Sequence, residues 1–123
     1  MFHGLELYNT LRRLSTQGHH ITTNVQAMAA SMGAHLFLAG DTRIVGPDAQ
    51  VMFHPISSGA GGSLHEMIDT VEWYKRLNEQ LDRTVFARTK ITPKLLEKKA
   101  SRSSGWWLDA DECIKYGVAH EVV

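Results

Sequence analysis

The feature that most constrains the fold is an alternation of short strand-like segments with helical ones. Residues 21–28 (ITTNVQAM) are rich in β-branched side chains and predict a strand. Residues 31–40 (SMGAHLFLAG) are small and apolar, and they predict a buried helix that ends at Gly40. Residues 42–46 and 49–54 predict two short strands around a Gly-Pro-Asp turn. This alternation indicates an α/β fold with a largely parallel sheet.

Other segments predict helices. Apolar residues recur at helical spacing over residues 4–16 and, on one face, over residues 64–89, so the second helix is expected to be unusually long. Residues 118–123 predict a closing strand. Typical helix-start pairs precede the long helix and two shorter ones: Ser63 with Glu66, Thr92 with Pro93, and Asp109 with Glu112.

The composition excludes several classes of protein. A length of 123 residues predicts one domain, 1–123, and a formal net charge of zero leaves no basic surface for nucleic acid. No apolar run is long enough for a membrane span. Cys113 is the only cysteine, which excludes an internal disulfide framework and fits a reducing, cytoplasmic location. No Cys/His spacing resembles a zinc site, so neither a metal nor another cofactor is predicted.

Two residues are candidates for chemistry. Ser31 lies where the first strand gives way to a helix, among small residues that would let a substrate backbone approach. The N–H of Met32, at the start of that helix, is a candidate oxyanion donor. Among seven histidines, only His54 has neighbours that suggest catalysis, because it closes a strand and precedes a Gly-rich loop. By spacing alone, an N-cap serine and a structural histidine are the commoner explanations.

The sequences of several segments resemble those of the Clp protease proteolytic subunit family. The segment AMAASMGA is similar to the nucleophile segment of that family, and GPDAQVMFHP is similar to its catalytic-histidine segment. SSGAGG follows as the Gly-rich loop. HGLELYNTL resembles the helix before the nucleophile strand, and WWLDADECIKYGVAHEVV resembles the family's ending. The resemblance runs in order from Gly4 to Val123 and is closest to phage-encoded and other divergent members.

This resemblance implies a site, a fold and partners. Ser31 would be the nucleophile, His54 the general base and the Met32 N–H an oxyanion donor. The fold would be the ClpP/crotonase-type α/β spiral of βαβ units, with residues 64–89 as its long handle helix. Subunits would form ring-shaped oligomers that hydrolyse peptides or unfolded proteins delivered by an ATP-dependent AAA+ unfoldase. The loop residues expected beside the substrate strand are Ser58, Gly59 and Gly61.

Two departures from the family pattern concern the catalytic machinery. The family's catalytic aspartate precedes the final segment, where residues 101–105 offer no acid. Ser103, Ser104 or a water molecule could orient the histidine instead, and Asp109 is expected to cap a helix. The family's Gly-Gly oxyanion loop and first βαβ units lie upstream of the segment matched by Gly4. The chain is therefore expected to hold the C-terminal two-thirds of the fold, as a fragment, as one part of a composite enzyme or as a degenerate member.

Three functions are compatible with these observations. The first is a ClpP-like serine endopeptidase subunit that acts through Ser31 and His54. The second is a catalytically inactive ClpP-like subunit with a role in assembly. The third, a crotonase-type acyl-CoA enzyme, shares the fold but fits the sequence around the serine and histidine less well. The presence of both candidate residues favours the first function, and the missing acid and Gly-Gly motif favour the second.

Overall fold

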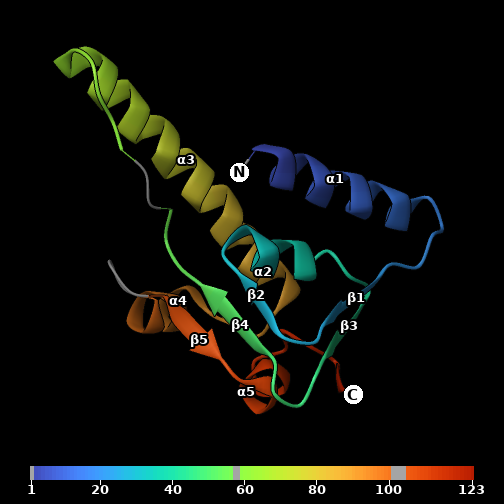
Figure 1. The fold of residues 1–123 in the computed structure, drawn as a ribbon. Coiled ribbons are helices and arrows are strands. Elements are labelled where there is room, and N and C mark those ends of the chain that lie inside the picture. The colour runs from blue at the N-terminus through green and yellow to red at the C-terminus, as the bar shows by residue number, and fades with distance from the viewer. Residues whose placement is uncertain (1, 57–58, 101–104) are drawn as a thin grey trace.

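The computed structural model describes residues 2–56, 59–100 and 105–123 of an α/β protein (Figure 1). A long helix, α3, runs diagonally across the molecule, and α1 lies over α2 on one side of the strands. In chain order, the helices and strands are α1 (Phe2–Thr16), β1 (Thr22–Val25), β2 (Met28–Ala30), α2 (Met32–Phe37), β3 (Thr42–Val45), β4 (Gln50–Phe53), α3 (Leu64–Arg88), α4 (Pro93–Lys99), β5 (Trp106–Leu108), α5 (Ala110–Lys115) and β6 (Glu121–Val122).

The strands form two small sheets that are mostly parallel. One has the order β1-β3-β6, and both of its pairings are parallel. The other has the order β2-β4-β5, in which β2 pairs with β4 in parallel and β5 pairs with β4 in antiparallel orientation. The sequence pattern does not predict β5, because three residues are too few to show an alternation.

The prediction of one strand over residues 21–28 is wrong, because the chain changes sheet within it. Val25 O accepts a hydrogen bond from Gly46 N at 2.7 Å, whereas Ala27 O accepts one from Gln50 N at 2.9 Å. The second partner belongs to the other sheet. A Cβ on Gly46 would lie 2.8 Å from the side-chain oxygen of Gln26 and 3.3 Å from its backbone oxygen, so glycine leaves room for Gln26 at this crossing.

The helix predicted over residues 31–40 is shorter than expected. It begins after Ser31 and its regular turns end at Phe37. The final turn is tightened by hydrogen bonds from Ala39 N to Leu36 O and from Gly40 N to Phe37 O. A Cβ on Gly40 would lie 2.2 Å from Thr23 Oγ1, so glycine is needed where α2 ends against β1.

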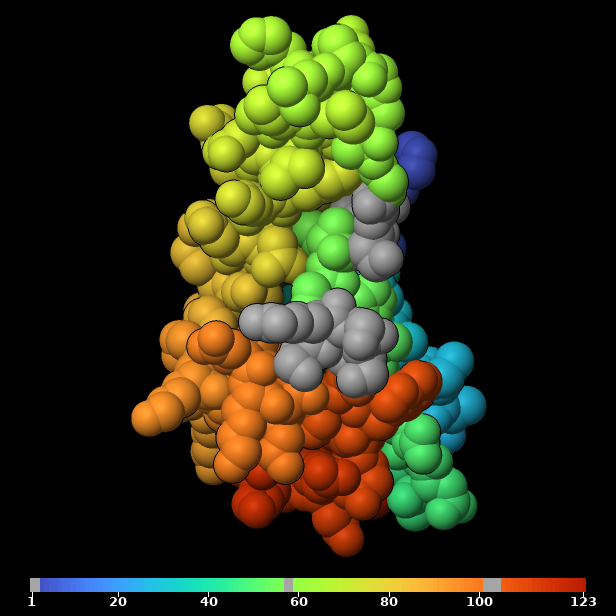
Figure 2. Space-filling view, turned by 90° about the vertical axis from the view of Figure 1, so that its left-hand side faces the viewer, coloured from blue at the N-terminus to red at the C-terminus, as the bar shows by residue number. Residues whose placement is uncertain are grey.

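The long helix is confirmed over Leu64–Arg88, with the predicted capping box formed by Ser63 and Glu66. Only its second half packs into the protein, through Leu77, Leu81 and Val85. Its first half extends beyond the body, as the yellow-green segment of Figure 2 shows. There the apolar side chains of the helix lie exposed, among them Leu64, Ile68, Val71 and Trp73.

A buried arginine on β3 connects the end of α3 with the turn after α5. Arg43 on β3 donates to Val118 O at 2.7 Å, to Arg88 O at 2.7 Å and to Gly117 O at 2.9 Å. Burial, and secondarily the charge of Arg88, lowers the pKa of Arg43 to about 10. These bonds fix the end of α3 against the turn after α5. Cys113, on α5, is buried in the hydrophobic core.

Within the described residues, no helix combines the length and apolarity that crossing a bilayer requires.

Candidate active site

The pairing of β2 with β4 determines where the two candidate catalytic residues lie. Ala30 on β2 is in register with Met52 on β4, and the two strands run parallel. Ser31 directly follows β2, and its N–H donates to Met52 O at 3.0 Å, which continues the ladder past the strand. His54 directly follows β4. Ser31 and His54 therefore leave the carboxyl ends of two adjacent strands, where active sites of α/β proteins gather.

Ser31 has an unusual backbone conformation. Its φ is 59° and its ψ is −120°, and it is the only residue other than glycine with a positive φ in the described part of the chain. It occupies the N-cap position of α2, but its side chain makes no cap hydrogen bond. Ser31 therefore does not cap the helix through its side chain, which is the common structural role of a serine at this position. Such a conformation costs about 1–3 kcal/mol and is concentrated at functional positions.

Met32 begins α2, where the first N–H groups of a helix have no acceptor within the helix. Its side chain packs under α1 at Gly4, where a Cβ would lie 2.2 Å from Met32 Cγ. Glycine at this position lets α1 cover the start of α2. This packing holds the start of α2, where the sequence predicts the Met32 N–H as an oxyanion donor.

The ring of His54 is oriented by the backbone of the next residue. His54 Nδ1 contacts the carbonyl oxygen of Pro55, and a carbonyl can only accept, so this nitrogen carries the proton. Nε2 then has the free lone pair that a general base needs. This partner was not predicted. Asp109 caps α5 instead, with Oδ1 accepting from Glu112 N at 2.8 Å, whereas Ser103 and Ser104 lie outside the described residues.

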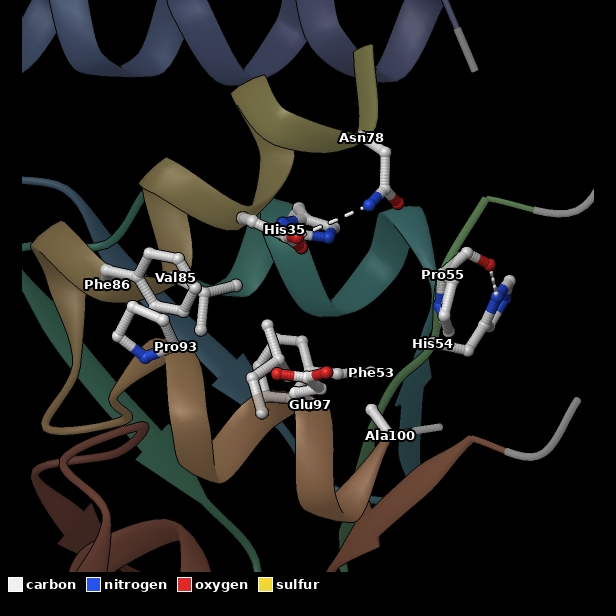
Figure 3. Close-up of a pocket in the computed structure, with 12 residues that line it drawn as sticks. His35, Phe53, His54, Pro55, Asn78, Val85, Phe86, Pro93, Glu97 and Ala100 are labelled. Carbon is white, nitrogen blue, oxygen red and sulfur yellow. Dashed lines mark hydrogen bonds between the residues drawn. The ribbon is translucent and has the colours of Figure 1, made fainter. Parts of the chain in front are cut away.

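A cavity of about 600 Å³ opens beside His54 (Figure 3). Ser31 is not among the described residues that line it. The lining comes from α2, the end of β4, α3 and α4: His35, Phe53, His54, Pro55, Asn78, Asp82, Val85, Phe86, Pro93, Leu96, Glu97 and Ala100. Such a volume lies within the usual range of small-molecule sites.

His35 is a site residue that the sequence interpretation passed over. It lies one helical turn after Ser31, and its N–H donates to Ser31 O at 3.3 Å. The residue is 7% exposed, and its ring packs edge-on against Phe53 with 5.9 Å between ring centroids. Its Nδ1 is buried without a hydrogen-bond partner. Burial, and secondarily the charge of His54, lowers the pKa of His35 from 6.5 to about 4. The i to i+4 spacing from Ser31 was the available signal.

Asn78 and Asp82 connect the cavity to the segment after His54. Asn78 Oδ1 accepts from Ile56 N at 3.0 Å, and Asn78 Nδ2 donates to Asp82 Oδ2 at 3.3 Å. Burial, and secondarily the charge of Glu79, raises the pKa of Asp82. Both polar residues lie on α3 beside its buried apolar residues, so the helical pattern gave no sign of their role.

The predicted substrate-strand loop is described only in part. Gly59 and Gly61 are exposed, and a Cβ at either position would meet nothing within 4 Å. Ser58 lies outside the described residues. No three His, Cys, Asp or Glu side chains of the described ranges come together as metal ligands.

Comparison with known proteins gives a family match along the whole chain. The Clp protease family model matches residues 1–123. The chain is 29% identical over 125 residues to ATP-dependent Clp protease proteolytic subunit 3 of Streptomyces coelicolor. That alignment covers 98% of this chain and 54% of the Streptomyces protein, so the chain spans about half the length of this curated relative.

The backbone conformation of Ser31 predicts that glycine is more stabilising than alanine at this position, the reverse of the usual order in a helix. Ser31→Gly should be more stable than Ser31→Ala by about 1 kcal/mol in urea unfolding, because glycine adopts a positive φ without strain. At the exposed helical position Asn9, the order should reverse, with Asn9→Gly less stable than Asn9→Ala by about 1 kcal/mol. Equal stability of the two Ser31 variants would contradict the conformation.

The burial of His35 predicts a loss of stability in acid. Its pKa is lower in the folded chain, so the unfolded chain takes up the proton first as the pH falls. The stability linked to the neutral ring is present above about pH 6.5 and is lost towards pH 4, by about 3 kcal/mol in total. His35→Phe should remove this part of the pH dependence of unfolding. His65→Phe, which removes an exposed imidazole from α3, is the matched control.

Proposed function

The chain belongs to the Clp protease family, and on that premise we propose that it is a serine-type endopeptidase subunit with Ser31 as nucleophile and His54 as general base. The observation that carries this proposal is the junction after β2. There a serine with a positive φ and no cap hydrogen bond leaves the sheet beside β4, the strand that directly precedes His54. A strained strand-to-helix turn of this kind exposes a nucleophile in other hydrolases.

The proposed reaction is acyl transfer in two steps. His54 Nε2 takes the proton of the Ser31 hydroxyl while Oγ bonds to the peptide carbonyl carbon, and the carbonyl oxygen becomes an oxyanion. The Met32 N–H donates to that oxyanion. The protonated His54 then gives its proton to the leaving amine as the C–N bond breaks. Water, deprotonated by His54, hydrolyses the acyl-enzyme and restores Ser31.

The Pro55 carbonyl takes over part of the usual role of the missing acid. It fixes the tautomer of His54 by accepting from Nδ1–H, as a catalytic aspartate would. A neutral carbonyl stabilises the imidazolium less than a carboxylate does. The proposed enzyme is therefore slower than a complete Ser-His-Asp triad.

Assembly and substrate delivery belong to the same proposal. The exposed apolar residues Leu64, Ile68 and Val71 lie on the part of α3 that extends from the body, which suits packing against another subunit in a ring. Backbone groups of the loop at Ser58, Gly59 and Gly61 would pair with an extended peptide. The Streptomyces relative is named as an ATP-dependent protease subunit, and we propose an AAA+ unfoldase as the partner of this chain.

A catalytically inactive subunit with an assembly role is the second candidate. The same exposed face of α3 favours it, because assembly requires this surface and no catalytic residue. The two candidates differ in whether the Ser31 hydroxyl is reactive.

An activated fluorophosphonate distinguishes them. The wild-type chain should be labelled at Ser31, Ser31→Ala should not be labelled, and His54→Ala should be labelled about 100-fold more slowly because it lacks the base. His65→Ala, a histidine exposed on α3, should keep the wild-type rate. The measurement is mass spectrometry of the labelled peptide over time. Absence of label on an oligomeric wild-type chain would support the assembly role.

A further inference from the structure

The cavity beside His54 is lined by both apolar and acidic side chains. Phe53, Val85 and Leu96 supply buried apolar surface. Asp82 on α3 and Glu97 on α4 supply carboxylates. None of the described lining residues carries a permanent positive charge. The described lining therefore offers apolar surface together with negative charge.

Asp82 lacks a cationic partner within the described residues. Among the residues that the structure describes, its Oδ2 accepts one hydrogen bond, from Asn78 Nδ2 at 3.3 Å. The carboxylate is partly removed from water, and this burial raises its pKa. The ionised form of such a carboxylate is stabilised when a cation approaches and forms a charge-assisted hydrogen bond with it.

His35 gives an independent indication of a ligand. The side chain is more than nine-tenths buried, it lines the cavity, and its Nδ1 has no hydrogen-bond partner. Figure 3 shows the ring in the middle of the lining side chains. Because its pKa is about 4, the ring is neutral at physiological pH. It therefore adds no positive charge that would offset the carboxylates of Asp82 and Glu97.

We propose that this cavity binds the side chain of a lysine or arginine of the peptide substrate. The methylene stem lies against Phe53, Val85 and Leu96, and the cationic head lies between Asp82 and Glu97. Lysine and arginine combine an apolar stem with a charged tip, which matches the apolar and acidic side chains of the lining. His54 borders the same cavity, so the bound side chain belongs to a residue close to the cleaved bond. This inference rests on the proposed peptidase function and adds its side-chain preference.

Binding to Ser31→Ala tests the inference without requiring catalysis. The probes are N-acetyl-Gly-Gly-Arg methylamide and its citrulline analogue, which keeps the shape but not the charge. A second pair replaces arginine with lysine and citrulline with norleucine. Dissociation constants come from NMR titration of the full chain. The charged member of each pair should bind about tenfold more tightly, as expected for hydrogen bonds to a charged group.

Variants of Asp82 and Glu97 test whether their carboxylates bind the charged side chain. Asp82→Asn and Glu97→Gln should each reduce the tenfold preference to about threefold or less, since each removes one of the two charges. Glu97 is exposed, so its variant also covers the case in which Asp82→Asn fails to fold. Glu72→Gln removes an exposed carboxylate of α3 outside the cavity and should keep the preference.

The outcomes separate this inference from the proposed function. A charge preference that Asp82→Asn or Glu97→Gln weakens supports the cavity assignment, even if fluorophosphonate fails to label Ser31 and the peptidase proposal falls. Citrulline or norleucine probes that bind as tightly as the charged ones overturn the inference, even if Ser31 is labelled. A preference that survives both cavity variants also overturns it.

Discussion

The parallel pairing of β2 with β4 is the constraint on which the candidate site depends. The hydrogen bond from Ser31 N to Met52 O carries the ladder one residue beyond β2 and fixes the point at which the chain must turn into α2. Because α2 begins at the next residue, that turn forces a positive φ on Ser31. The same pairing brings the end of β4, and with it His54, to the neighbouring strand end. Without this register, Ser31 would be an ordinary helix cap.

The second half of α3 builds the rest of the site from the other side. Leu77, Leu81 and Val85 anchor it in the core, while Asn78 and Asp82 on the adjacent face reach the cavity and the segment after His54. Arg43 holds the end of this helix through the Arg88 carbonyl. Packing away from the cavity therefore positions the polar groups that α3 brings to it.

Features that depend on local interactions could be predicted from the sequence. The capping boxes that begin at Ser63 and Asp109 and the long periodic face of α3 are of this kind, and all were confirmed. The division of residues 21–28 between two sheets was missed, because it depends on which distant strands supply the partners. His35 and the cavity were missed because they result from the packing of four segments. Ser31 and His54 were singled out by a family resemblance, since their spacing alone favoured structural roles.

The central claim is that Ser31 and His54 lie close enough to exchange a proton. The most direct test is the thiol pKa of Ser31→Cys, measured from the pH dependence of alkylation by iodoacetamide. The native thiol of Cys113 does not interfere, because it is buried and burial raises its pKa to about 12. A nearby imidazolium lowers a thiol pKa below its usual value of about 8.5. The account predicts a lowered pKa in Ser31→Cys that rises by about one unit or more when His54→Ala is added. An identical pKa with and without His54 would contradict it.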